Sequence, residues 1–546
     1  MKLLYTLALS LFTAHLTFAQ FSSDPSQPMP VCNAAHGQSN VISLPDGNDG
    51  NYLFWLDNRG SVNTTIYALY GQHLDSGGNP LWANNGKVIL DKDTVSIKSF
   101  NCVLFDGGIL VTWVQGQNSY NDSMFVKKIN PSGNDVWAQP TLIESTNFSA
   151  SILGIETYGI KAIPNDSGAF INYSVVYIGG SSGIKFNRIN FNGVKQWAAS
   201  KTNSLPGYTF FTYPGIQNTF YSLSRGNGMG SGIYIQKYNM QSVPQWANPV
   251  DISQGVSGNG LAGNCKFLTD NSGNSYVVWD SYSSADILLT KIDAAGNFAW
   301  TPSYKSVVNL ANTLQGRSDA VLNNNNLFIT WSDNRITGQA TAFTQKYNAS
   351  GAAQWIANGV QLGVINSNYC YPKIAYSDSG SVAIAYIMGA PWELYVQRVR
   401  SNGTLTWSGS GKILASDHSF INYADYTITS DSNGCNAVFW HESSTGDLYG
   451  AKVCSDGTLV TVAELLNKEV KIFPNPTADQ INIELGSSNL INEIEILDMQ
   501  GRILKTVIIE NGQQYQTLNV NEFSKGVYLI KIKAGNESII KKVIIK

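Results

Sequence analysis

The sequence is poor in charge and in the groups that carry most enzyme chemistry. Only 13% of its 546 residues are charged, the net charge is -3, and the chain contains five histidines. So little positive charge gives no basic face for nucleic acid, which argues against that class of partner. No His-Glu-x-x-His spacing, phosphate-binding glycine loop or Gly-x-Ser-x-Gly elbow in a strand-turn-helix context occurs. The sequence therefore contains no recognisable catalytic motif.

Long apolar runs are also missing. The longest near the start, residues 3–12, follows Lys2 and precedes the small residues Thr17 and Ala19, which is the pattern of a signal peptide cleaved before Gln20. The run is too short to anchor the chain by spanning a bilayer, and no later segment is long and apolar enough to span. We therefore expect a signal peptide over residues 1–19 and an exported mature chain without a transmembrane segment.

No Cys-x-x-Cys spacing occurs among the six cysteines, which argues against a zinc or redox motif. Export to an oxidising space permits disulfides. The apolar runs 437–442 and 448–453 flank a polar turn, and a hairpin there makes opposed residue numbers sum to about 889. Cys435 and Cys454 fit this sum and are a candidate disulfide, the alternative being two free buried thiols. The pairing of the other four stays open: Cys32, Cys102, Cys265 and Cys370.

What the sequence does contain is a tryptophan that recurs in a fixed frame. Seven tryptophans follow a turn residue by four positions, and that residue is glycine in six cases and Ser242 in the seventh. The seven are Trp82, Trp137, Trp197, Trp246, Trp300, Trp355 and Trp407. Successive members lie 49 to 60 residues apart, by subtraction of their numbers. A period near 50 with turn residues at a fixed offset is typical of a repeat architecture.

Each repeat contains four strand-like runs. A second aromatic often lies upstream, as in 52–55, a third run such as 66–74 precedes the frame, and we expect the fourth strand to begin at the framed tryptophan. Four short strands in about 50 residues match one β-propeller blade. We predict an all-β fold with eight blades over residues 20–466. Alternatives are seven blades with one unit outside the ring, and a linear β-solenoid.

The eighth unit, at about 424–462, has Thr461 where the tryptophan should be. A terminal unit of this kind is expected in a repeat protein, and the segment between Gln20 and Asn40 is the candidate for covering its sheet edge. The framed tryptophans are interpreted as blade packing, because core aromatics that recur at a repeat period are structural. The irregular points of the frame, Trp197 in blade three and the off-frame Trp392 in blade seven, are where we first look for a ligand.

Two further patterns are interpreted as turns. Asp57-Asn58-Arg59 recurs as Asp333-Asn334-Arg335, which indicates a turn held by side-chain hydrogen bonds. The segments 46–51 and 270–274 cluster oxygen ligands that could hold calcium, but Asp, Asn and Gly are also the residues that hairpin turns favour. We expect no cofactor, with calcium at these turns as the alternative.

The repeat region, from about Val31 to Val462, resembles the β-propeller repeats of exported Bacteroidetes proteins, which read W-x-D-x-R, Y-x-Q and G-x-x-x-W. Residues 55–59 and 331–335 match the first part, and 70–72, 234–236 and 395–397 match the second. Blade six departs with Phe343-Thr344-Gln345. The resemblance implies a propeller fold and an exported protein.

The last eighty residues, 467–546, differ in composition. They contain no Trp, Cys or His, and they alternate in short runs separated by polar turns, which predicts a small Ig-like β-sandwich. The expected strands are 480–485, 494–497, 503–509, 515–520, 527–532 and 538–545.

Within this domain, three motifs and a basic end resemble the type A C-terminal sorting domain of type IX secretion. The matching residues include Pro474, Asn475, Pro476, Gly501, Gly526, Tyr528, Lys541 and Lys542. The resemblance implies export across the outer membrane by the type IX machinery, removal of the domain, and release or attachment to the cell surface.

The leading hypothesis is thus a secreted or cell-surface binding protein with a propeller as its platform, for a polysaccharide or a surface protein. One alternative is a secreted polysaccharide hydrolase with paired carboxylates in the propeller channel. The other is a structural component of the surface or matrix.

Overall fold

The computed structural model describes residues 21–546 except for short gaps. The gaps are 60–65, 92–94, 117–120, 147–151, 166, 178–181, 203–204, 206–208, 226–231, 255, 257–260, 282–285, 309, 311–312, 337, 364–369, 389–391, 419–420, 443, 458, 460–469, 486–490, 499–501, 514 and 535–536. The expected signal peptide and Thr461 therefore lie outside the described residues.

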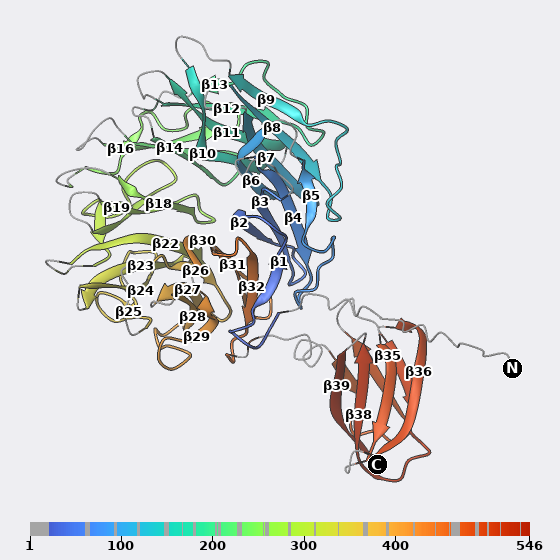
Figure 1. The fold of residues 1–546 in the computed structure, drawn as a ribbon. Coiled ribbons are helices and arrows are strands. Elements are labelled where there is room, and N and C mark those ends of the chain that lie inside the picture. The colour runs from blue at the N-terminus through green and yellow to red at the C-terminus, as the bar shows by residue number, and fades with distance from the viewer. Residues whose placement is uncertain are drawn as a thin grey trace.

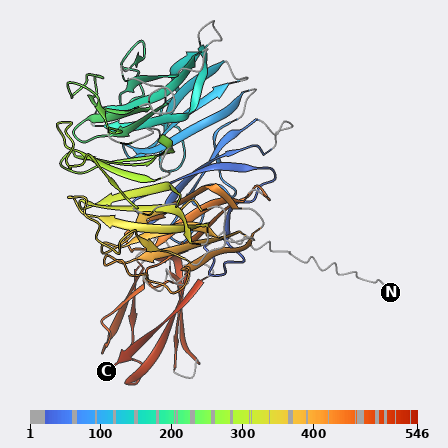
Figure 2. The ribbon, with the colours of Figure 1, turned by 90° about the vertical axis from the view of Figure 1, so that its left-hand side faces the viewer.

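Eight four-stranded antiparallel sheets are arranged around a ring, as Figures 1 and 2 show. The first four blades are β2 (Gln38–Pro45), β3 (Asn51–Asp57), β4 (Ala68–Leu74) and β5 (Lys87–Leu90); β6 (Ser96–Phe105), β7 (Gly108–Gly116), β8 (Asp122–Ile129) and β9 (Thr141–Thr146); β10 (Ile152–Asn165), β11 (Gly168–Tyr177), β12 (Ser182–Ile189) and β13 (Lys201–Thr202); and β14 (Thr209–Pro214), β15 (Thr219–Arg225), β16 (Ile233–Asn239) and β17 (Val250–Asp251).

Blades five to seven are β18 (Leu261–Thr269), β19 (Ser275–Ser281), β20 (Ile287–Ile292) and β21 (Tyr304–Ser306); β22 (Gln315–Asn323), β23 (Asn326–Ile336), β24 (Gln339–Tyr347) and β25 (Val360–Gln361); and β26 (Lys373–Tyr376), β27 (Val382–Met388), β28 (Trp392–Val399) and β29 (Lys412–His418). Blade eight contains β30 (Ile421–Ser430), β31 (Asn436–Glu442) and β32 (Leu448–Val453), and its outermost strand is β1 (Met29–Cys32).

The ring closes through this eighth blade. β1 pairs with β32, and Met29 lies opposite Gly450. The first strand of each blade contacts the first strand of the next, and β30 contacts β2 to complete the circle. The eight-blade prediction is confirmed, and the two alternative architectures are wrong. The closing segment lies where the sequence placed it.

The expectation that the fourth strand begins at the framed tryptophan is wrong. Trp82 lies in an irregular segment, and the fourth strand of blade one begins five residues later at Lys87. The reason is that the Trp82 ring packs on its own sheet and on the next unit at once. A Cβ added to Gly133 of the next unit would lie 3.1 Å from the Trp82 ring, whose Nε1 donates to the carbonyl of Pro131 at 3.1 Å.

This contact recurs from blade to blade. The same close approach joins Trp137 to Gly193, Trp246 to Gly296, Trp300 to Gly351, Trp355 to Gly403, and Trp407 to Gly457. All six glycines, Gly133 included, have a positive φ between 71° and 93°. Glycine adopts this conformation without strain and leaves room for the indole. Each of these framed tryptophans, together with the glycine of the next unit, therefore forms a joint between neighbouring blades.

The joint between blades eight and one is made differently. The N-terminal segment, residues 21–33 and hereafter the latch, takes the place of the missing tryptophan. A Cβ on Gly78 would lie 2.9 Å from both Phe21 and the Met29 sulfur. Lys452 Nζ donates to the carbonyl of Ser76 at 3.0 Å, the equivalent of the carbonyl that the indole reaches elsewhere.

The C-terminal region forms a separate two-sheet sandwich. One sheet contains β33 (Val470–Phe473), β34 (Gln480–Leu485) and β37 (Tyr515–Asn519). The other contains β36 (Ile503–Gln513), β35 (Ile491–Leu497), β38 (Gly526–Ala534) and β39 (Glu537–Ile545). All six expected strands are present, and β33 is an additional one. An isoleucine-rich core between the sheets includes Ile481, Ile494 and Ile532. Across the part of the chain that the structure describes, no helix has the length and apolar character needed to cross a membrane.

Candidate functional site

The recurring Asp-Asn-Arg segments are structural, as the repetition predicted. In blade one, Asp57 accepts hydrogen bonds from Trp55 Nε1 at 2.9 Å and from the Arg59 backbone at 2.8 Å. The Arg59 guanidinium pairs with Asp57 and lies 3.9 Å from the centroid of the Tyr70 ring. Blade six repeats this arrangement with Trp331, Asp333, Arg335 and Phe343. These side chains are occupied in holding the blade end, so they leave no group for a ligand.

Carboxylates do gather around the ring axis, but each is engaged across a seam between blades. Asp425 of β30 accepts the backbone N–H groups of Asn40 and Val41, at 2.7 and 2.9 Å. Asp280 accepts the N–H of Arg317 at 2.7 Å and the hydroxyl of Ser318 at 2.6 Å. Asp122 likewise accepts the N–H of Ile155 at 2.9 Å. The first strands carry β-bulges at these points, which expose the N–H groups.

Blades five to seven place charges at one equivalent position. Lys266, Asp319 and Lys373 each lie opposite the second-strand residue that precedes the buried aromatic. Lys266 Nζ is 2.9 Å from Asp319, whose carboxylate raises the pKa of Lys266. Burial lowers the pKa of Lys373, although Asp319 and Asp425 act in the opposite direction. The axis therefore carries a partly buried network of alternating charge.

A glycosidase needs two carboxyl groups that flank the scissile bond, one of them held protonated. Asp319 and Asp425 are instead bound by a lysine or by backbone N–H groups. His441, beside Asp425, has its Nδ1 3.7 Å from that carboxylate, and burial lowers the pKa of His441. Nothing in this arrangement leaves an acid and a base facing a common space.

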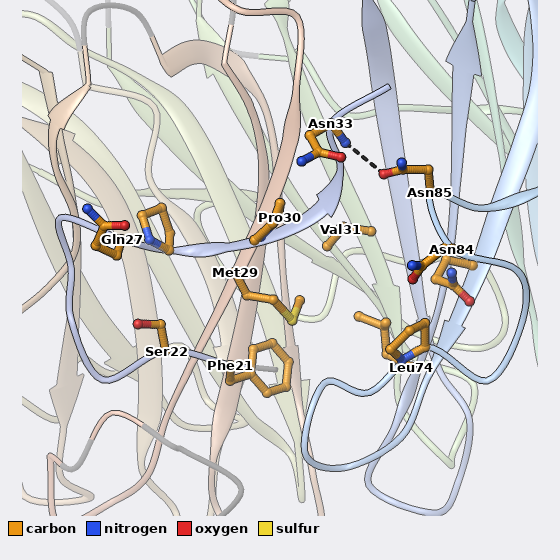
Figure 3. Close-up of a pocket in the computed structure, with 13 residues that line it drawn as sticks. Phe21, Ser22, Gln27, Met29, Pro30, Val31, Asn33, Leu74, Asn84 and Asn85 are labelled. Carbon is orange, nitrogen blue, oxygen red and sulfur yellow. Dashed lines mark hydrogen bonds between the residues drawn. The ribbon is translucent and has the colours of Figure 1, made fainter. Parts of the chain in front are cut away.

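An open cleft lies at the closing seam, between the latch and blade one (Figure 3). This seam cleft has a volume of about 530 Å³. Its lining consists of Phe21, Ser22, Gln27, Pro28, Met29, Pro30, Val31, Asn33, Gln72, Leu74, Pro80, Asn84 and Asn85. The cleft lies at the joint where Phe21 and Met29 of the latch take the place of a framed indole. Sequence reasoning missed it, since no repeat period marks it.

The sites singled out by the irregular frame are packed. Trp197 meets Phe170 edge to face at 6.1 Å, and the Lys201 ammonium lies 4.2 Å from its ring centroid. Trp392 packs on the core between blades seven and eight. Neither residue lines the seam cleft.

The candidate calcium turns use their oxygens within the turn. Asp46 Oδ1 accepts the N–H groups of Asn48 and Gly50, and Asp270 Oδ1 accepts those of Ser272 and Asn274. Among the described residues, no group of three or more His, Cys, Asp or Glu side chains is placed to hold a metal ion. Calcium at these turns stays a hypothesis.

In the hairpin that ends blade eight, Asn436 lies opposite Val453, which is the expected register. The structure joins Cys435 to Cys454 by a disulfide. The other four cysteines form no disulfide in the described structure, and burial raises the pKa of the Cys32 thiol to about 11.

The sorting residues gather at one end of the sandwich. Asn475, between the two prolines, accepts the N–H of Ile544 at 2.9 Å and donates to the carbonyl of Lys542 at 2.9 Å. Gly526 opens β38 and lies opposite Ile545, and the Tyr528 hydroxyl donates to the carbonyl of Ser524 at 2.7 Å. Lys541 pairs with Ile530 across the same two strands. Gly501 lies outside the described residues, and Arg502 Nε lies 2.6 Å from Asp498 Oδ2.

Residues 471–546 match the model of the secretion system C-terminal sorting domain. This domain marks the chain for export by type IX secretion, to the cell surface or the medium, and implies contact with that machinery. The first motif thus contacts β39 through Asn475, and β39 pairs with β38, which carries the third motif.

The other similarities are limited in extent or in identity. An endo-acting ulvan lyase of Formosa agariphila is 36% identical over 84 residues, which is 15% of this chain and 16% of the lyase. Among solved structures, puromycin hydrolase has a TM-score of 0.41 at 10% identity, covering 77% of this chain and 62% of its own. A subtype N10 neuraminidase-like protein from a bat influenza A virus has a TM-score of 0.33 at 12% identity, covering 59% and 98%. The propeller assignment rests on the sheet topology itself.

Proposed function

We propose that this protein is an exported binding protein, in which the propeller is a rigid platform and the seam cleft holds the ligand. The observation that carries the proposal is the cleft. It lies at the joint where the latch takes the place of a framed tryptophan, and it has a volume of about 530 Å³. That volume lies within the roughly 300–1,000 Å³ of small-molecule sites.

The engaged state of the axial carboxylates favours binding over hydrolysis. An enzyme of the alternative class would have to break the contact of Asp319 with Lys266 or that of Asp425 with blade one before either could act as acid or base. The similarity to a lyase covers too little of either chain to favour catalysis.

The test uses the secreted full-length protein on panels of glycans and surface proteins, with retention and product release measured together. Retention without products supports the proposal. New chain ends from any glycan would overturn it in favour of an enzyme, and neither retention nor products would favour a structural component.

Export is tested separately in the native host. Deletion of residues 467–546 removes the sorting domain and should leave the propeller inside the cell. A matched deletion of residues 444–446, which precede β32, keeps that domain, so it should affect folding without removing the export signal. Unchanged appearance of the protein outside the cell after the first deletion would contradict the role of the domain.

A further inference from the structure

We infer that the seam cleft binds an uncharged, hydroxyl-rich ligand, a short neutral oligosaccharide or the end of a neutral polysaccharide chain. The inference deepens the proposed function and rests on it. It comes from the chemistry of the cleft walls, from the hydrogen-bonding state of the amide side chains there, and from the prolines at the outer edge of β1.

The walls of the cleft carry no formal charge, because none of its lining residues is Asp, Glu, Lys, Arg or His. An ionised ligand placed there would lose its hydration without gaining an opposite charge, which is costly. An uncharged ligand meets no such penalty. The floor, formed by Pro28, Met29, Val31 and Leu74, is buried and apolar, and suits the C–H faces of a sugar ring.

Three amide side chains project from this floor without hydrogen-bond partners among the described residues: Gln27, Asn33 and Asn84. All three are exposed, and Figure 3 shows Gln27 at one end of the cleft and Asn84 at the other. An amide offers donors and an acceptor on one plane. Neighbouring sugar hydroxyls, which both donate and accept, match this arrangement.

Two neighbouring amide side chains, by contrast, form hydrogen bonds within the protein. Gln72 donates to the carbonyl of Ala83 at 2.8 Å and accepts the N–H of Trp82 at 3.0 Å, and Asn85 accepts the N–H of Asn33 at 3.0 Å. These bonds hold the wall in place. The structural amides and the unpartnered ones therefore alternate along the same surface.

A peptide that adds a strand is the competing occupant, because β1 has an open edge on the outside of blade eight. Pro28 and Pro30 remove two backbone donors from this edge. An extended chain could not form a regular ladder on it, and prolines at edge strands commonly prevent such pairing. Recognition at the cleft must then come from the side-chain amides.

Blade six provides a natural control. Its segment Trp355-Ile356-Ala357-Asn358-Gly359 corresponds to Trp82-Ala83-Asn84-Asn85-Gly86, and both make the same bonds: Gln345 donates to the carbonyl of Ile356 at 2.8 Å, as Gln72 does to that of Ala83. Ala357 stands where blade one has Asn84. Asn84→Ala is therefore compatible with the local fold.

The experiment measures binding of the secreted full-length protein to uncharged tetrasaccharides of glucose and of mannose, to sulfated or carboxylated counterparts, and to a proline-rich peptide. We expect binding to at least one uncharged tetrasaccharide, and at least roughly tenfold weaker binding by the double variant Asn33→Ala/Asn84→Ala, since two neutral hydrogen bonds are lost. Ala357→Asn, which adds an amide where no latch lies, should bind as the wild type does. Unchanged thermal unfolding of the double variant shows that its fold is intact.

Each other outcome overturns the inference in an identifiable way. Binding that the double variant retains in full would place the glycan elsewhere; the role of an exported binding protein would stand, but the seam cleft would not be its site. Preference for the charged glycans or for the peptide would refute the ligand class alone. Binding of none of these probes would also refute the ligand class, and release of products from them would refute the proposed function itself.

Discussion

Phe21 lies against Gly78 in the position that a tryptophan ring occupies against the glycine of the next unit at other seams. Phe21 is 2% exposed, its backbone N–H donates to the carbonyl of Gly77 at 3.1 Å, and its ring lies 6.2 Å from that of Phe439. The latch thus joins the first blade to the last through a packed aromatic.

Replacement of Phe21 tests this joint. Phe21→Ala removes a buried ring between blades eight and one, and we expect a loss of about 3–5 kcal/mol in the free energy of unfolding. Denaturant unfolding of the secreted protein measures it. The control is Phe191→Ala, a ring that is 39% exposed on blade three and should cost much less. Equal losses of stability for the two variants would show that the latch does not hold the propeller closed.

The frame makes opposite predictions for two equivalent positions. Gly193 has a φ of 77°, and an added Cβ would lie 2.6 Å from the Trp137 ring. Gly193→Ala should therefore destabilise the protein by about 2–4 kcal/mol. Ser242 holds the same place with a φ of 62°, and its Oγ has no hydrogen-bond partner in the described structure. Ser242→Gly should stabilise by about 1 kcal/mol. If the two variants shifted the thermal unfolding temperature in the same direction, the proposed need for glycine at this position of the frame would be contradicted.

The Cys435–Cys454 pair predicts a cross-link in the secreted protein. The two residues are 19 positions apart, and a disulfide that closes a loop of this length contributes about 3 kcal/mol. Cys435→Ser/Cys454→Ser should lose that amount, and reduction of the wild type should reproduce the loss. Mass spectrometry of the non-reduced protein checks the linkage directly. Alkylation of both thiols in freshly secreted protein would refute it.

The sorting domain should weaken in acid. Lys533 and Lys531 bind Glu495 and lower the pKa of that carboxyl from 4.5 to about 2. A depressed folded-state pKa means that the stabilising contribution is complete above about pH 4.5 and is lost as the pH falls toward 2. Glu495→Gln should remove this dependence. Amide hydrogen exchange across β35 and β38 measures it, with Glu522→Gln, an exposed residue, as the control. An identical pH profile for the Glu495 variant would contradict the assignment.

Periodicity alone predicted the blades because each unit repeats the same packing problem. The hairpin register at Cys435 and the closing segment followed from the same regularity. The cleft could not be predicted in this way. It lies where Phe21 and Met29 take the place of an indole, and the trace of this replacement in the sequence is the threonine at position 461. The seam contacts of Asp280 and Asp425 depend on bulges that bring backbone N–H groups of the next blade into reach. Such bulges leave no pattern in side-chain alternation.

The start of the fourth strand was misplaced for a related reason. An aromatic beside an apolar run is typical of a strand, but Trp82 packs on Tyr52 and Phe54 of its own sheet and also contacts the following blade. The secondary structure of a residue that packs on two blades cannot be predicted from the sequence pattern of one blade alone.

Blade eight has a consequence for how the chain folds. Met29 and Gly450 are direct neighbours in one sheet although 421 positions separate them, by subtraction of their numbers. Pairings of such long range require a large loop to close and form late and slowly. Seven blades can assemble from local hairpins, whereas the eighth must wait until almost the whole propeller has been synthesised and collapsed. Refolding of the separate blades should therefore precede a distinct, slower step in which the circle is completed.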